Sequence, residues 1–156
     1  MQAHYPSTGG TACFSKAGLA EGTTSATIKT AAPNGAGTDY AILGLGYHKV
    51  DTDNIAVTAH TVQATETTCL YLVQINSSGT VSTKKGDEVS TTELTEGRAV
   101  LKWPKPDDSK CPIGGYKVAV ATSYTYTNGT TDHSATGMTV TYYDFVGGMP
   151  QSPLTA

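Results

Sequence analysis

The chain has little charge, few large apolar residues and almost no arginine. Charged residues make up 15% of its 156 residues, against about 25% in an average soluble domain. Leu, Ile, Val and Phe total 26 residues, about 17%, and so low a fraction indicates disorder only when the net charge is high. The net charge is −3, so disorder of the whole chain is not indicated. Arg98 is the single arginine and no basic stripe occurs, so we expect no nucleic-acid partner.

Long apolar runs and paired cysteines are also missing. Apolar runs such as residues 118–121 are far too short to span a bilayer, so we expect no membrane partner. Cys13, Cys69 and Cys111 show no C-x-x-C spacing, which argues against a disulfide framework and against a zinc finger. A single Cys69–Cys111 bridge and three reduced, buried thiols both fit this pattern, and reduced thiols are favoured.

Threonine and glycine are abundant instead, with 27 and 17 residues. From residue 39 onward, short segments of alternating or apolar residues are separated by Gly, Asn and Pro turns. This pattern predicts an all-β fold, an antiparallel β-sandwich or barrel. The expected strands cover residues 40–50, 55–60, 69–75, 80–83, 98–103, 115–121 and 138–145.

Residues 1–38 differ from the rest because they are rich in Gly, Ala, Ser and Thr and poor in large apolar side chains. Such a segment cannot form a core of its own, so we expect an extended N-terminal arm that orders against a partner, with residues 26–30 as its one strand. Phe14, Leu19 and Ile28 are its best anchors. The predicted division is therefore an arm over 1–38, a β domain over 39–148 and a C-terminal tail over 149–156.

Motifs that carry catalysis or bind metals are not found, so we expect no enzyme, no cofactor and no metal site. Residues 51–54 resemble part of a calcium loop but lack its glycine and its glutamate, which favours a polar turn. Residues 132–134 contain Asp, His and Ser, yet neighbours in a turn point in different directions and do not form a triad. One short helix is expected within residues 88–97, with Ser90 as its N-cap.

Nine tyrosines against two phenylalanines form a skewed ratio. Tyrosine suits half-buried positions, because its ring packs while its hydroxyl reaches water or a partner. Tyr124, Tyr126 and Tyr143 are expected on exposed faces. Two interpretations of these three stay open: an aromatic interface with a partner, or simple β-propensity on a sheet surface.

Several strings, taken in order, resemble a group of small virion structural proteins of tailed bacteriophages, the capsid decoration (cement) and head-fibre proteins. The resemblance spans roughly residues 18–148 and depends on the order and spacing of its pieces. They are GLAEGTT at 18–24, TIKT at 27–30, TDNIAVTA at 52–59, YLVQINSSGTV at 71–81, CPIG at 111–114 and GTTDHSATGMT at 129–139.

The resemblance implies a non-enzymatic protein that is made in the cytoplasm of a host bacterium and sits on the capsid surface of the virion. Its partner would be the major capsid protein, and a homo-oligomer, with a trimer favoured, is expected by analogy. In this reading Phe14, Leu19 and Ile28 contact the capsid. The alternative is a head-fibre or tail-fibre protein that binds a receptor or a glycan.

Overall fold

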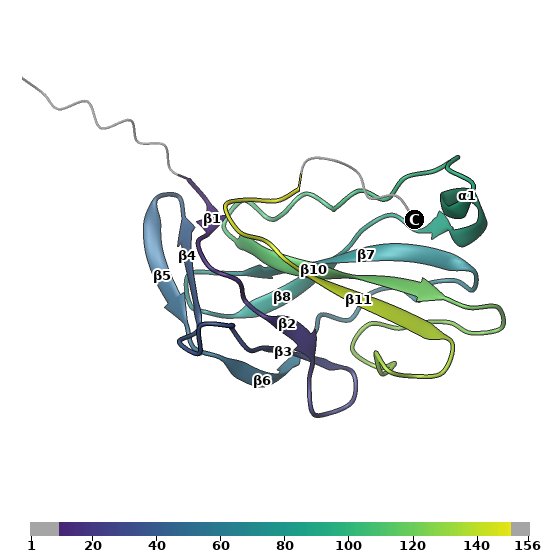
Figure 1. Ribbon diagram of the computed structural model, residues 1–156, viewed down its shortest axis with the longest axis horizontal. Helices are drawn as coiled ribbons and strands as arrows, with labels where there is room; N and C mark the ends of the chain where they lie inside the picture. The colour runs from purple at the N-terminus through teal and green to yellow at the C-terminus, as the bar shows by residue number, and fades with distance from the viewer. Residues whose placement is uncertain (1–9, 151–156) are drawn as a thin grey trace, which may run out of the picture.

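The main sheet of the protein is built from the strongest alternating segments of the sequence. The computed structural model describes residues 10–150, and its longest strands run antiparallel in the order β11–β10–β7–β8, with β9 also paired to β7 (Figure 1). These strands are β7 (Thr67–Ile75), β8 (Val81–Lys85), β9 (Val89–Ser90), β10 (Cys111–Val120) and β11 (Met138–Asp144).

Two smaller sheets form a second layer against one face of the main sheet. One has the order β1–β4–β5 and the other the order β2–β3–β6, and all their pairings are antiparallel. In Figure 1, β4 and β5 cross the left-hand end of the main sheet, and β2, β3 and β6 lie below it. Their bounds are β1 (Ala12–Cys13), β2 (Leu19–Glu21), β3 (Thr27–Thr30), β4 (Thr38–Ile42), β5 (Leu45–Lys49) and β6 (Thr52–Ala56).

The hydrophobic core lies between these layers, so the predicted all-β, sandwich-like class is confirmed. Alternation directs Tyr116, Val118 and Val120 of β10 toward this core. Side chains from both small sheets meet them there, and all of the following are buried: Cys13, Ala17, Leu19, Ile28, Tyr40 and Ile42.

The prediction that residues 1–38 form an arm without a core of its own is wrong for the part from β1 onward. Leu19 and Ile28 are 7% and 0% exposed, and both belong to the shared core. Few large apolar residues are needed there because the main sheet supplies the opposite side of the core. Residues 1–9 of the predicted arm and 151–156 of the predicted tail lie outside the described residues.

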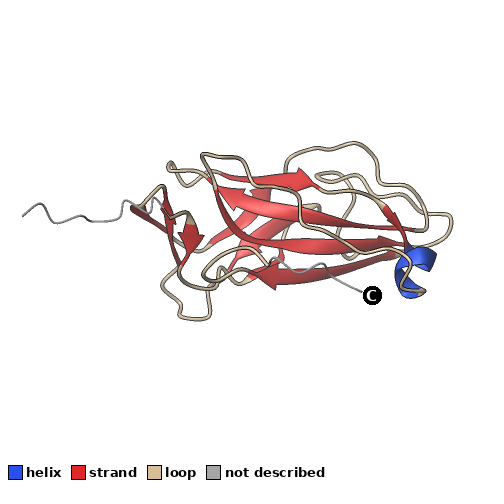
Figure 2. Cartoon of the chain, turned by 90° about the horizontal axis from the view of Figure 1, so that it is seen from above, coloured by secondary structure: helices blue, strands red, loops and turns tan. Residues whose placement is uncertain are grey.

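The outer face of the main sheet is covered by the helix and by the chain that follows it. Helix α1 (Thr91–Thr95) is a single turn, and its N-cap Ser90 accepts from the Glu93 backbone N–H, as predicted. Leu94 and Leu101 pack on Leu70 of β7 in a second apolar cluster. Figure 2, viewed from above, shows the helix at one end of the elongated array of strands.

Three predicted strands differ in the structure. The segment expected over 40–50 is divided into β4 and β5 by the turn at Leu43 and Gly44. Residues 98–103 form no extended strand, because the chain runs over the sheet surface and uses Leu101 as a buried cover residue before Pro104. The strand expected over 55–60 is β6, which is shifted toward the N-terminus and ends at Ala56. Beyond it, Thr58 exchanges hydrogen bonds with Thr83 of β8, so this stretch is held by side chains as well as by the backbone.

Candidate functional site

Four large apolar side chains are exposed around the β1–β4–β5 sheet, and we call this surface the apolar end. Phe14, Leu43, Leu45 and Val146 are 61%, 66%, 65% and 52% exposed. They come from three segments that the backbone joins: Gly147 N–H donates to Cys13 O at 2.7 Å, and Ile42 pairs with Leu45. Exposed apolar side chains that gather in one region of a surface make it a candidate contact surface for a partner.

Leu43 is held in an unfavourable backbone conformation at the tip of the β4–β5 hairpin. Ile42 and Leu45 pair directly, so Leu43 and Gly44 alone form the turn, with φ of 51° and 82°. Positive φ at both central positions is the type I′ hairpin turn, which favours Asn–Gly because a Cβ in the left-handed region costs about 1–2 kcal/mol. A leucine there is thus both strained and exposed, and such strain is concentrated at functional positions.

The predicted capsid contacts fall in different places. Phe14 is exposed at the apolar end and stays a candidate. Leu19 and Ile28 are not candidates, because pairing of β2 with β3 and of β3 with β6 directs both side chains into the core. Leu43 and Leu45 were missed because residues 40–50 were expected to form one strand, in which Gly44 was the only local signal of a turn.

The predicted exposed tyrosines also separate. Tyr124 is 41% exposed and lies against Gly137. Tyr143 is half-buried, with its ring edge-on to Trp103 at a centroid distance of 5.7 Å. The prediction for Tyr126 is wrong, because its backbone forms a bridge with Gln63 and its side chain is completely buried.

Tyr126 belongs to a buried chain of hydrogen bonds that the sequence did not reveal. Tyr116 and Tyr126 each donate a hydroxyl proton to Asn128 Oδ1, at 2.6 and 2.7 Å. Tyr126 Oη therefore accepts from His133 Nε2 at 2.7 Å, which leaves His133 Nδ1 to accept from the Tyr142 hydroxyl. Every proton in this order has an acceptor, so the neutral imidazole with its proton on Nε2 is the form that fits.

Burial shifts the pKa values of these groups away from neutral pH. It raises the pKa values of Tyr116, Tyr126 and Tyr142, and it lowers the pKa of His133 to about 4. General acid–base work is most effective when the pKa lies near the working pH. The network therefore acts as a set of satisfied core contacts, and Asn128 extends it through its amide to Thr58 O and Thr83 Oγ1.

Residues 51–54 lie at the end of the β5–β6 connection and in β6, where they tie strands together. Asp53 accepts from the backbone N–H of Thr23 at 3.0 Å, and Asn54 accepts from that of Thr24 at 2.6 Å. The hydrogen bonds from Thr23 lower the pKa of Asp53. Within residues 10–150, no group of three or more His, Cys, Asp or Glu side chains is placed to hold a metal ion.

The sheet register decides between the two cysteine alternatives. Cys69 lies opposite Val118, whereas Cys111 lies opposite Ile75, so the two thiols sit at opposite ends of the β7–β10 pair. Six residues of strand separate them by about 20 Å, which excludes a Cys69–Cys111 bridge. All three thiols are free and buried, and burial raises the pKa values of Cys69 and Cys111 to about 12.

Comparisons of the chain with protein-family models, with curated proteins and with solved structures found no match. Among residues 10–150, no helix is long and apolar enough to cross a membrane.

Proposed function

We propose that this chain is a bacteriophage capsid decoration (cement) protein, which binds the outside of the head and stabilises the shell through non-covalent contacts. The observation that carries the proposal is the apolar end, where a strained Leu43 is presented beside Leu45, Phe14 and Val146. The resemblance of residues 18–148 to small phage virion proteins supplies the class of partner, the major capsid protein.

In this proposal the apolar end, and not the extended arm predicted over residues 1–38, is the binding element. Burying an exposed leucine against the shell contributes about 1.5–3 kcal/mol. A ligand that binds the assembled shell in preference to its free subunits stabilises the assembled state by linkage. The hairpin is rigid before binding, since β4 and β5 pair along five positions, so little conformational entropy is lost on contact.

The expected setting follows from the same proposal. The protein is made in the host cytoplasm, and its free, buried thiols support a reducing site of synthesis. We expect a homo-oligomer on the capsid surface, with a trimer favoured by analogy with decoration proteins. Light scattering on the purified chain would measure the oligomeric state directly.

Leu43→Asn tests the proposal because it separates stability from binding. Asparagine accepts the left-handed conformation, and Asn–Gly is the preferred type I′ sequence. The free energy of unfolding of the variant should therefore be about 1 kcal/mol higher than that of the parent. It also removes an exposed apolar side chain, so its affinity for heads of the encoding phage that lack this protein should fall about 30-fold, equivalent to about 2 kcal/mol. Co-sedimentation with such heads measures the affinity.

Val62→Asn is the matched control, because Val62 is 55% exposed and lies outside the apolar end. It should leave head binding unchanged. Full binding by the Leu43→Asn variant, or an equal loss in both variants, would contradict the assignment of the apolar end. Failure of the parent chain to bind heads at all would contradict the proposed function itself.

A further inference from the structure

A cavity of about 490 Å³ lies beside the chain segment that crosses the outer face of the main sheet. Its volume falls within the range of about 300–1,000 Å³ that is typical of small-molecule sites. Trp103, Pro106 and Pro112 give it apolar walls. Thr11, just before β1, also lines it, so the cavity extends toward β1, which lies at the opposite end of the molecule from α1 (Figure 1).

One wall of the cavity is fixed by a dense set of hydrogen bonds around Asp107. Gln74 of β7 donates to its carboxylate at 2.7 Å, and the Asp107 backbone N–H donates back to Gln74 Oε1 at 2.9 Å. Lys84 and Lys110 also contact this carboxylate, each at 3.0 Å. The hydrogen bonds, first that from Lys84, lower the pKa of Asp107 to about 2. The wall is therefore in place before any ligand arrives.

Trp103, on another wall of the cavity, is held in place by its packing. Its ring edge rests on Gly115 of β10, where any Cβ would overlap the indole, and Phe145 packs edge-on to it at a centroid distance of 4.9 Å. Its Nε1 is shielded from solvent and has no hydrogen-bond partner among the described residues. A buried donor without a partner is uncommon in a native fold.

The polar lining of the cavity offers both donors and acceptors but no net charge. Two lysines and two aspartates line it, so their charges cancel. Lys105 and Asp108 are 84% and 94% exposed and form only a loose pair at 3.5 Å, so both remain available to a ligand. Lys110 Nζ donates to Ser82 and to Asp107, which leaves one of its three protons for a further acceptor.

We propose that this cavity binds a neutral saccharide in its pyranose form. A pyranose ring has an apolar C–H face that packs on aromatic and proline rings, and a rim of hydroxyls that both donate and accept. The cavity matches both properties, and its balanced charge disfavours acidic and basic ligands. The inference does not depend on capsid binding, because it concerns other residues and an isolated chain.

Trp103 is the single tryptophan of the chain, so its fluorescence reports on this cavity alone. The probes are maltose, lactose and N,N′-diacetylchitobiose, with sorbitol as an open-chain polyol and glucosamine and glucuronate as charged sugars. We expect a saturable change in emission with at least one disaccharide, a matching shift of the indole N–H resonance, and no saturable response to sorbitol or to the charged sugars.

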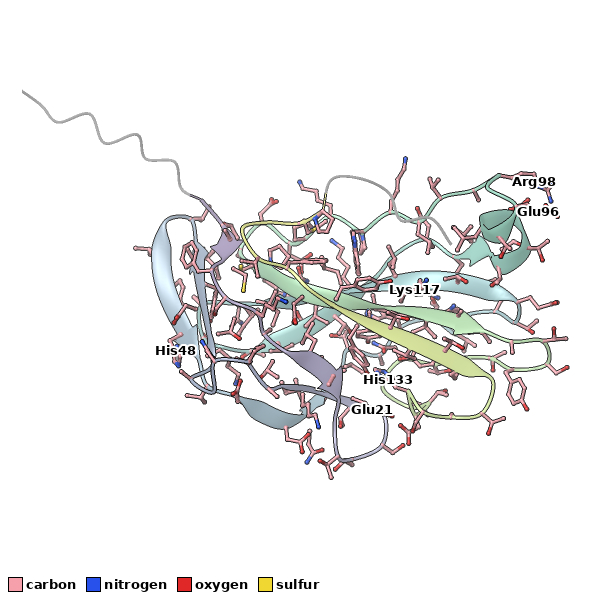
Figure 3. All side chains as sticks on the ribbon, viewed as in Figure 1. Glu21, His48, Glu96, Arg98, Lys117 and His133 are labelled. Atoms are coloured by element: carbon pink, nitrogen blue, oxygen red, sulfur yellow. The ribbon has the colours of Figure 1, made fainter. Side chains whose placement is uncertain are left out.

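A double variant with Lys105→Ala and Asp108→Ala should weaken that binding at least about fivefold, because it removes polar partners from the rim. The matched control carries Glu96→Ala and Arg98→Ala, which removes another exposed ion pair, beside α1 (Figure 3) and outside the lining of the cavity. It should bind like the parent.

Four results would overturn the proposal: no saturable response to any of the three disaccharides, equal binding by both double variants, tighter binding of a charged sugar, or a response to a proline-rich peptide in place of the saccharides. Both double variants change only exposed side chains, so they should fold, and circular dichroism verifies this before titration.

Discussion

Lowering the pH from 8 to 5 should weaken the fold through His133. This imidazole is 3% exposed, and both of its nitrogens are used in the neutral form, by Tyr126 and Tyr142. The charged groups near it are Asp132, whose field partly offsets the effect of burial, and Glu21, which accepts from the Ser134 N–H at 2.9 Å and is labelled beside His133 in Figure 3.

The size of the effect follows from the shift in the pKa of His133. Burial lowers it from 6.5 to about 4, so the unfolded chain binds the proton more tightly than the folded chain. Stability is therefore fully present above pH 6.5 and is lost as the pH falls toward 4. At pH 5 the unfolded imidazole is almost fully protonated and the folded one only about one-tenth, which corresponds to a loss of about 2 kcal/mol relative to pH 8.

Urea unfolding of the parent and of the His133→Gln variant at the two pH values measures this loss. The glutamine amide still donates to Tyr126, and we expect a variant about 1–2 kcal/mol less stable at pH 8. Between pH 8 and pH 5 the free energy of unfolding of the variant should fall by about 2 kcal/mol less than that of the parent, so the stabilities of the two proteins converge at pH 5. His60, whose pKa burial also lowers, and the carboxylates are common to both proteins and cancel. Parallel pH profiles for the two proteins would refute the reasoning.

Three further predictions concern the fold. Deleting residues 1–38 should abolish cooperative unfolding, because β1 to β3 supply core side chains such as Ile28; a stable β domain over 39–148 would contradict this. The three thiols should resist iodoacetamide until urea unfolds the chain, and fast labelling of the native protein would show that they are accessible. Gly115→Ala should destabilise the protein by at least about 2 kcal/mol and shift Trp103 fluorescence, since the new methyl group meets the indole and Tyr71 O at 2.6 Å; unchanged emission would argue against this packing.

Local pattern was a good guide for the long strands of the main sheet. The strand expected over 69–75 is β7, the segment at 138–145 is β11, and the segment at 115–121 is β10, which begins four residues earlier at Cys111. Between β7 and β8, where Asn and Gly separate the two expected strands, the chain does turn, with Gly79 at a φ of 77° and its N–H donating to Asn76 O at 3.1 Å. Alternation and turn residues are local properties, so one chain suffices to recognise them.

The candidate site was only partly accessible from sequence. Phe14 was selected for its size in a region of small residues, and it is exposed at the apolar end. Leu19 and Ile28 were selected for the same reason and are core residues. Nothing local distinguishes these three, because exposure depends on which strand lies opposite, and that is decided by pairings between distant segments.

Sequence by itself therefore determined the all-β class, most strands of the main sheet and the single helical turn, since these depend on side-chain periodicity and on turn and cap residues. The tertiary structure alone decided that residues 12–38 belong to the core, that Tyr126 is buried and that Trp103 borders a cavity. Burial and the grouping of side chains arise from long-range packing, in which a few apolar residues suffice once another layer completes the core.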